Sequence, residues 1–428
     1  MTLWPHQIRA VEQLREAFRT HRRALLVLPT GAGKTRTASH VIERYLARDP
    51  ARRVLFLVHR IELAKQAARQ LPGPVRIVSG ELDDGSPDAP VTVASVQTLL
   101  ARDLRPEATM VVVDEAHNYA APEWCQVVAS YDRALLLGLT ATPERGDGRP
   151  LGDLFDTLVA PTSIAELTEA GVLVPCEVYA PPARQQGLAS EPHDALARHR
   201  DTARPWRKAV VFAANVAHAE SVAEQCRAMG WRTGVVTGDV GDKDRAATLE
   251  AFRNGELDVL CNVFVLTEGW DDPSTDCLVL ARGCTHGGTY LQMVGRVLRA
   301  SPGKSRCVVL DLTGATHDHG LPDAPRRYSL EGKGVSAEKA IAIRQCLACG
   351  AAYQPGPRVC PVCGEAVPPP PPPRLSSAEL GRIMETHSAD KRRATWEALQ
   401  RTAADRGYKR GWAAYQFKAR YGAWPQFR

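Results

Sequence analysis

Two short segments contain residue types that suit phosphate and metal chemistry. The first, PTGAGKT, forms a glycine-rich turn between a predicted strand that ends at Leu28 and a predicted helix. Gly31 and Gly33 let successive backbone N–H groups converge on phosphate oxygens, and the helix N-terminus adds partial positive charge. Lys34 can neutralise the β and γ phosphates, and the Thr35 hydroxyl can bind Mg²⁺. The segment predicts a nucleotide site. An ordinary strand-to-helix turn is the alternative, because the first glycine of the strict phosphate-loop pattern is missing.

The second segment, MVVVDEAHN, places Asp114 and Glu115 at the end of an apolar predicted strand. Unpaired charges are costly at such a position, and Mg²⁺ held by Thr35 and a nucleotide would compensate them. Asp114 would hold the metal through its water shell, and Glu115 would position and deprotonate the attacking water. Two solvated carboxylates that cap a helix are the alternative. The order of the two segments on successive predicted strands favours nucleotide hydrolysis.

The elements that must position these residues alternate along the chain. Short apolar runs and helical patterns follow one another through residue 315, as expected of parallel strands with crossover helices. The alternation pauses over 144–205, where turn-forming residues are frequent. We therefore expect two α/β domains in series. A cysteine cluster follows, then six prolines that should form a stiff spacer, and then a basic helical segment rich in aromatic residues.

Composition limits the class of protein and the class of partner. The 428 residues are 44% hydrophobic and 24% charged, which suits two globular domains with an appendage. We expect a soluble, cytoplasmic protein with no membrane partner, because the N-terminus lacks a secretory pattern and no apolar run approaches the roughly 20 residues of a membrane span. From Arg374 onward the chain has twelve Lys or Arg against five Asp or Glu. A basic tail favours nucleic acid as the partner, and a solvated tail is the alternative.

Four cysteines form two C-x-x-C pairs, each followed by glycine. They are Cys346, Cys349, Cys360 and Cys363. Four thiolates at this spacing can bind Zn²⁺ tetrahedrally, and so small a segment has too little core to fold otherwise. We predict a structural zinc ribbon that contacts DNA; disulfides or a redox pair are the alternatives.

Aromatic residues alternate with Lys and Arg from Trp396 to the end of the chain. This mixture suits stacking on nucleobases together with phosphate neutralisation. A small helical module is the alternative, in which several aromatic side chains form a core or dock on another domain: Trp412, Tyr415, Phe417 and Tyr421.

The segments PTGAGKT, DEAH and LTATP, followed by TEGWDDP and QMVGRVLR, resemble the ordered motifs of superfamily 2 helicases and translocases of the DEAH-box type. The resemblance covers most of the chain. It implies an α/β fold with two tandem RecA-like parallel-sheet lobes, ATP in the cleft between them, and a nucleic-acid strand that crosses both. We expect these domains: lobe 1 at 1–158, lobe 2 at 159–335, a zinc ribbon at 336–367, a polyproline linker at 368–375 and a basic helical tail at 376–428.

The resemblance also assigns residues of the second lobe to catalysis. Gln292, Arg296 and Arg299 match the motif that reaches across the cleft to the γ-phosphate. A fixed guanidinium charge suits the charge that develops on the phosphoryl oxygens. The two arginines are three residues apart, so we expect them on one face of a helix. Two solvated arginines on a surface helix are the alternative.

Other residues match family positions with binding or coupling roles. Those implied to contact nucleotide are Gln7, Gly269 and Asp271; those implied to couple the lobes are His117, Thr140 and Thr142; those implied to contact the nucleic-acid backbone are Arg60, Gln97, Thr98, Asn215 and Thr267. Any of the last group could instead cap a helix.

The C-x-x-C pairs and the ending GYKRGWAAYQFKARYGAWP resemble the bacterial RadD family of DNA-repair ATPases, which has phage-borne relatives. This implies DNA as the strand and DNA-repair proteins as partners. The segment ARGCTHGGTYLQ departs from the Pro-Thr pattern of the family. This departure argues against strong strand-separating activity. We expect an ATP- and Mg²⁺-dependent helicase or translocase acting on nucleic acid, with DNA favoured. The alternatives are a repair clamp that hydrolyses ATP with little unwinding, and an RNA remodeller.

Overall fold

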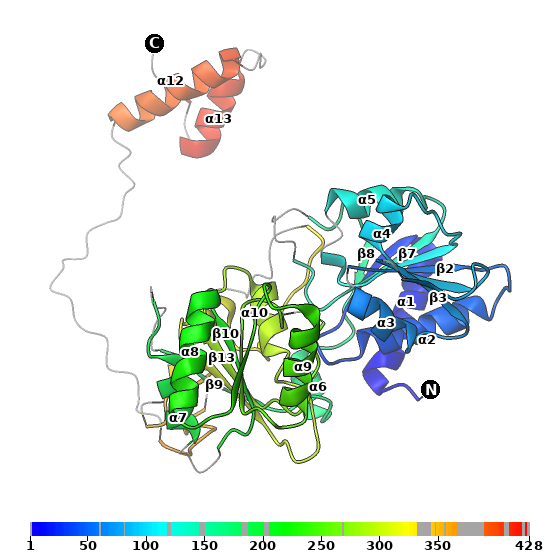
Figure 1. Cartoon of the computed structure of the whole chain (residues 1–428). Coiled ribbons are helices and arrows are strands. Elements are labelled where there is room, and N and C mark those ends of the chain that lie inside the picture. Colours follow the sequence, from blue (N-terminus) through cyan, green and yellow to red (C-terminus); the bar gives the residue numbers. More distant parts are fainter. Residues whose placement is uncertain are drawn as a thin grey trace. The chain divides into compact units, whose positions relative to one another are not determined.

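The computed structural model shows a chain that folds as two compact units, 1–368 and 369–428 (Figure 1). The structure describes residues 2–59, 61–80, 82–117, 121–144, 150–181, 187–200, 205–267, 269–331, 344–346, 348–354, 357–366, 389–405, 411–421 and 424–425. Among these residues, no helix is long and apolar enough to cross a membrane.

The first sheet is mostly parallel, with the strand order β4-β3-β5-β2-β6-β7-β1-β8. Only β3 and β4 pair antiparallel among its described strands. Its strands are β1 (Arg23–Val27), β2 (Val54–Val58), β3 (Val75–Ser79), β4 (Leu82–Asp84), β5 (Val91–Ser95), β6 (Met110–Val113), β7 (Leu135–Thr140) and β8 (Thr157–Val159). The central strands are buried along their whole length, as expected where helices cover both faces.

The helices that accompany this sheet begin before its first strand. They are α1 (Pro5–Thr20), α2 (Lys34–Leu46), α3 (Ile61–Ala68), α4 (Val96–Ala101) and α5 (Pro122–Ala129). Each of α2, α3 and α4 follows a parallel strand at its carboxyl end. The loops that carry the phosphate-binding and carboxylate motifs therefore lie at one edge of the sheet.

The second sheet has the order β11-β12-β10-β13-β14-β9-β16-β15. Its strands are β9 (Cys176–Tyr179), β10 (Ala209–Ala213), β11 (Thr233–Val236), β12 (Val259–Asn262), β13 (Cys277–Ala281), β14 (Cys307–Asp311), β15 (Arg344–Gln345) and β16 (Ala351–Tyr353). The strands from β11 to β9 pair in parallel, and β16 adds antiparallel to β9. Two parallel-dominated sheets confirm the expected α/β class.

The helices of the second sheet differ in length. They are α6 (Ile164–Glu169), α7 (Pro192–Arg200), α8 (Val216–Ala228), α9 (Asp242–Arg253), α10 (Gly287–Val294) and α11 (Ala315–His319). The interval 144–205, which the sequence pattern marks as a pause, contains β8, α6, β9 and α7.

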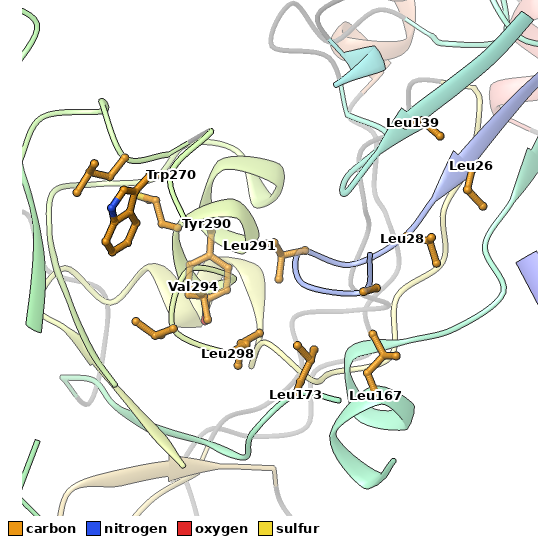
Figure 2. Close-up of a cluster of buried hydrophobic side chains, with 14 of the residues drawn as sticks. Leu26, Leu28, Leu139, Leu167, Leu173, Trp270, Tyr290, Leu291, Val294 and Leu298 are labelled. Carbon is orange, nitrogen blue, oxygen red and sulfur yellow. The ribbon is translucent and has the colours of Figure 1, made fainter. Parts of the chain in front are cut away.

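One cluster of buried apolar side chains includes residues of both sheets and of the segment between them (Figure 2). Leu28 follows β1, Leu173 precedes β9, and Leu291 belongs to α10. Gly295, directly after α10, lies so close to the phosphate loop that a Cβ there would be 2.5 Å from the Cβ of Thr30. The start of the second sheet's arginine motif therefore packs directly on the nucleotide loop of the first.

The unit 369–428 contains α12 (Ala389–Asp405) and α13 (Trp412–Tyr421). The Trp396 and Phe417 rings meet edge to face with centroids 5.8 Å apart, and Phe417 is buried. Tyr415 and Trp424 are exposed. The aromatic residues of the tail thus form a small core and also leave rings accessible to solvent.

Candidate active site and metal centre

The glycine-rich loop between β1 and α2 has the backbone that a phosphate site requires. Gly31 and Gly33 adopt φ values of 90° and 81°, which residues with a Cβ rarely adopt. A Cβ on Gly33 would also lie 2.4 Å from Nε2 of Gln7. Gly33 is the N-cap of α2, so Lys34 and Thr35 begin the helix at its positive end. The loop fits the predicted phosphate-binding role.

Gln7 connects the first turn of α1 to this loop. Its side chain is fully buried, its Nε2 donates to the carbonyl of Ala32 at 3.2 Å, and its Oε1 accepts from the backbone N–H of Trp4 at 3.0 Å. The ring of His6 contacts the same carbonyl at 2.9 Å, and burial lowers the pKa of His6. A neutral imidazole that donates its N–H to Ala32 fits both observations. Gln7, which the resemblance implies to contact nucleotide, therefore lies directly beside the phosphate loop.

Glu115 has an unusual backbone and an unsatisfied side chain. Its φ is 48°, and its Oε2 is buried with no hydrogen-bond partner among the described residues. The ring of His117 lies beside this carboxylate, with its Nδ1 3.6 Å from that oxygen. A buried acceptor without a donor is costly unless a water or ion satisfies it. Strain and an unpaired carboxylate at one residue are typical of catalytic positions.

A cavity of about 470 Å³ brings together the predicted residues of both sheets, and its volume lies in the range of small-molecule sites. From the first sheet it is lined by Gly31, Gly33, Lys34, Thr35, Asp114 and Glu115, and from the second by Gly269, Asp271, Arg296 and Arg299. The exposed ring of Trp4 lines it as well. Arg296 and Arg299 of the second domain therefore line the same cavity as the phosphate-loop lysine.

The two arginines do not share a helix face, so that prediction is wrong. Helix α10 ends at Val294, and Arg296 and Arg299 follow in turns and an isolated bridge to Leu173. Arg296 is buried and donates to the carbonyls of Trp270 and Thr267 at 2.5 and 2.6 Å.

Arg299 forms an ion pair with Asp271, which is itself partly exposed. Gly31 lies so close to this arginine that an added Cβ would be 3.1 Å from the Cγ of Arg299. The residues after Val294 form a turn that packs closely against the phosphate loop. This turn takes the place of the helix that the three-residue spacing predicts.

The coupling residues form one hydrogen-bonded chain between the sheets. Gln292 Nε2 lies 3.3 Å from Nε2 of His117, and His117 Nδ1 lies 3.2 Å from Oγ1 of Thr140. The Thr140 hydroxyl donates to the carbonyl of Thr142 at 2.7 Å. A His117 ring that accepts at Nε2 from Gln292 and donates from Nδ1 to Thr140 fits both of these contacts. The carboxylate segment is thus connected to α10 through side chains alone.

Glu144 is a contact that sequence reasoning missed. Its Oε2 accepts the backbone N–H of Gly288 at 2.8 Å, in the first turn of α10. A Cβ on Gly288 would lie 3.0 Å from Oγ1 of Thr142. The signal was available in ARGCTHGGTYLQ, because two successive glycines indicate close approach of a backbone.

Comparison with known proteins agrees with this geometry. Residues 1–145 match the family model "Type III restriction enzyme, res subunit", and residues 193–301 match "Helicase conserved C-terminal domain". The two matches fall in turn on strands of the first sheet and on strands of the second. The prediction of a helicase or translocase is thereby confirmed at the level of the family.

Two curated relatives are helicases by name. The chain is 27% identical over 354 residues to the putative ATP-dependent helicase IRC3 of Saccharomyces cerevisiae, across 73% of this chain and 51% of that protein. It is 30% identical over 366 residues to the putative mitochondrial ATP-dependent helicase irc3 of Schizosaccharomyces pombe, across 77% of this chain and 59% of that protein. The chain thus spans little more than half the length of these relatives.

A solved structure has a similar fold. The fragment of a putative HsdR subunit of a type I restriction enzyme from Vibrio vulnificus YJ016 matches with a TM-score of 0.58 and 22% identity. The match covers 77% of this chain and 66% of that one. At this identity the likeness concerns the fold alone.

The predicted nucleic-acid contacts have different local environments. Arg60 lies outside the described residues. Gln97 is exposed on α4, whereas Thr98 is buried and accepts from the N–H of Gly80 at 2.7 Å. Asn215 caps α8 by accepting the N–H of His218 at 2.8 Å. Thr267 is buried, and its Oγ1 has no partner among the described residues.

The four predicted zinc ligands do converge. The sulfur atoms of Cys346, Cys349, Cys360 and Cys363 lie within 4.8 Å of one another. The Cys346–Cys363 and Cys349–Cys360 sulfur pairs are 3.7 and 3.8 Å apart. Tetrahedral zinc with Zn–S bonds of about 2.3 Å separates its sulfurs by about 3.8 Å. The donor set and its spacing fit Zn²⁺.

Proposed function

We propose that this chain is an ATP-driven motor that moves along, or remodels, a nucleic-acid strand. The observation that carries the proposal is the cavity lined by Lys34, Thr35 and Glu115 from the first sheet and by Arg296 and Arg299 from the second. A site divided between two sheets can change shape when a triphosphate becomes a diphosphate. Hydrolysis can therefore alter the relation between the two domains that would hold the strand.

The chemistry follows from the positions of the side chains. Lys34 and the N–H groups of the loop would hold the phosphates, and Thr35 and Asp114 would hold Mg²⁺, which neutralises phosphate charge when bound. Glu115 would take a proton from the attacking water at its buried Oε2, the atom that has no donor among the described residues. Arg299 would turn from Asp271 toward the γ-phosphate, since Asp271 is 43% exposed and water can solvate its carboxylate after the pair breaks.

The side-chain chain from His117 to Gln292 would carry the state of the nucleotide to α10. Rearrangement of Glu115 would displace His117, whose Nε2 contacts Gln292. Glu144 would hold the start of the same helix through the N–H of Gly288. We assign coupling to this set, which includes Thr140 and Thr142.

The finer assignments also belong to this proposal. Within superfamily 2 we place the chain in the DEAH-box type, on the segment DEAH, and near the RadD-like DNA-repair ATPases, on the C-x-x-C pairs and the aromatic basic ending. DNA, repair-protein partners and a cytoplasmic location follow from that placement. We keep the domain boundaries at 158/159, 335/336, 367/368 and 375/376, with a zinc ribbon in the third domain.

The proposal is tested by ATP turnover with single-stranded DNA, duplex DNA and RNA at one fixed salt concentration, because polyanion affinity depends steeply on salt. We expect stimulation by at least one of the three polymers. Glu115→Gln should still bind ATP but hydrolyse it very slowly, and Lys34→Ala should lose binding. Retained turnover in Glu115→Gln, or no response to any nucleic acid, would contradict the proposal.

One observation favours a second function, a clamp that hydrolyses ATP and separates strands poorly. The contact between Glu144 and Gly288 occupies the segment where the family has Pro-Thr. Translocation and strand-displacement assays on the same substrate distinguish the two functions, because the clamp would fail in both assays. An RNA remodeller would instead respond to RNA alone.

A further inference from the structure

Phe264 stands out in the second sheet as an aromatic side chain exposed in a strained backbone. It is 49% exposed, and its φ is 58°, a conformation that non-glycine residues rarely adopt. Residues held in such conformations cluster at binding sites, where the surrounding structure fixes them. Because about half of Phe264 is exposed to water, packing into a hydrophobic core does not explain an aromatic residue at this position.

The loop that carries Phe264 is firmly anchored. Asn262, at the end of β12, is fully buried; its Nδ2 donates to the carbonyl of Val211 on β10, and its Oδ1 accepts the N–H of Leu266. The N–H of Thr267 donates to the carbonyl of Phe264 at 3.1 Å. The ring is therefore presented by a fixed turn.

Arg282 contacts the ring from the neighbouring end of the sheet. Its guanidinium carbon lies 3.3 Å from the centroid of Phe264. Nε and Nη1 of this arginine are buried and have no hydrogen-bond partner among the described residues. No carboxylate of that part of the chain forms an ion pair with Arg282, and burial lowers its pKa. The exposed ring of Phe264 and the partly buried, uncompensated cation of Arg282 thus form one pair.

The position of the pair connects it with the strand that the motor would hold. Phe264 follows β12 and Arg282 follows β13, and β10 lies between these strands. Asn215, a predicted nucleic-acid contact, follows β10 at the same carboxyl edge. Phe264 and Arg282 therefore follow the two strands that flank β10, at the same edge of the sheet as Asn215. This is the edge where the second domain is predicted to contact the nucleic-acid backbone.

We propose that Phe264 and Arg282 form a binding site for one nucleotide unit of a nucleic-acid strand, with the base stacked on the exposed part of the ring and the guanidinium attracting the adjoining phosphate. Stacking on a ring tolerates any base, and a fixed cation attracts any phosphate, so the site is independent of sequence. The inference rests on the proposed function and adds a base contact to it.

The same loop also connects this site to the nucleotide cavity. Arg296 donates to the carbonyl of Thr267, three residues after Phe264, and lines the cavity beside Lys34. A shift of Arg296 toward phosphate would release that carbonyl and let the loop move. Base stacking on Phe264 and the phosphate state of the bound nucleotide would then both affect the position of the loop from Phe264 to Thr267.

The experiment measures equilibrium binding of the full chain to a single-stranded DNA oligomer and to a phosphodiester strand of equal length that lacks bases. Phe264→Ala should weaken binding of the base-containing strand by about 5- to 150-fold, the range for one stacked base. Binding of the abasic strand should not change. Phe264→Trp should restore affinity, and Phe264→Leu, which keeps an apolar side chain, should behave like the Ala variant.

Arg282→Gln should weaken binding of both strands and reduce the slope of log affinity against log salt by about one. Met229→Ala is the matched control, because Met229 is also exposed (42%) but follows α8, whose end lies at the other edge of the sheet.

The inference is wrong if Phe264→Ala binds the base-containing strand as the parent does, or if the abasic strand loses equal affinity. A change of oligomeric state in Phe264→Ala without a change in strand affinity would identify the ring as a contact between copies and would also overturn it. If the parent chain binds neither strand, the proposed function fails instead.

Discussion

At the scale of single residues, Arg296 and Arg299 have different environments. We therefore expect their alanine variants to differ in stability. Arg296 is buried and satisfies two carbonyls, whereas Arg299 pairs with the partly exposed Asp271. We expect Arg296→Ala and Arg299→Ala each to reduce ATP turnover by about 10³-fold or more, as removal of an arginine finger does. Only Arg296→Ala should lower the thermal unfolding midpoint, since it leaves carbonyls unpaired at roughly 1–3 kcal/mol each.

Steady-state ATPase rates and unfolding midpoints of both variants check this prediction. Arg232→Ala is a suitable control, because Arg232 forms an exposed ion pair with Asp258 and lines no part of the cavity. Equal loss of stability in the Arg296 and Arg299 variants would show that the contacts of Arg296 to Thr267 and Trp270 do not persist in solution.

The sequence predicted residues whose chemistry is carried by a short motif. Lys34, Thr35 and Glu115 could be assigned because glycine spacing and strand-end carboxylates act locally. Glu144 could not, because its partner Gly288 is 144 residues away and offers only a backbone N–H. The helix predicted for Arg296 was wrong because close packing of the following turn on Thr30 overrides local spacing.

At the scale of elements, α10 is held by the first domain at its start and along its length. Glu144 accepts the N–H of Gly288, and His117 contacts Gln292 one turn later. We expect Glu144→Ala to reduce the stimulation of ATPase by nucleic acid roughly 2- to 30-fold, the range for mutations that alter coupling between sites. The KM for ATP should change little, because Glu144 does not line the nucleotide cavity.

The measurement compares stimulated and basal ATPase rates over a range of ATP concentrations. Gly288→Ala should have the same effect independently, since its Cβ would lie 3.0 Å from Thr142 Oγ1 and 3.3 Å from Glu144 Oε2. Glu123→Ala, an exposed change in the first turn of α5, is the control. A loss of basal rate equal to the loss of stimulated rate would contradict a coupling role.

Element prediction succeeded where apolar runs were long enough to be buried on both faces. Runs such as VLFLV and MVVV became central strands because parallel sheets are covered by helices on both sides. The strands β8, β9 and β16 have three or four residues, and their membership depends on partners distant in sequence. Such short strands have no periodicity to detect.

At the scale of the whole molecule, the cysteine site completes the second sheet. Residues Ala351 and Ala352 of β16 pair with Tyr179 and Val178 of β9, directly after the loop that carries Cys346 and Cys349. Without bound metal, four thiolates within 4.8 Å of one another would repel, and so small a segment has little core of its own. The metal would therefore hold β16 in place beside β9, although β9 lies far earlier in the chain.

We expect the purified chain to contain one Zn²⁺ at this site, and a chelator or Cys360→Ser to remove it. Loss of the metal should free β16, so the backbone amides of β9 that face it should exchange hydrogen faster, while those of β2 and β6 in the first sheet should not change. Elemental analysis and hydrogen-exchange mass spectrometry check both parts. Cys226→Ser, a buried thiol on α8 remote from the cluster, should keep the metal. Unchanged exchange in β9 after demonstrated loss of zinc would mean that the pairing of β16 with β9 is stable without the metal, so that the ribbon is an attachment and not a structural part of the second sheet.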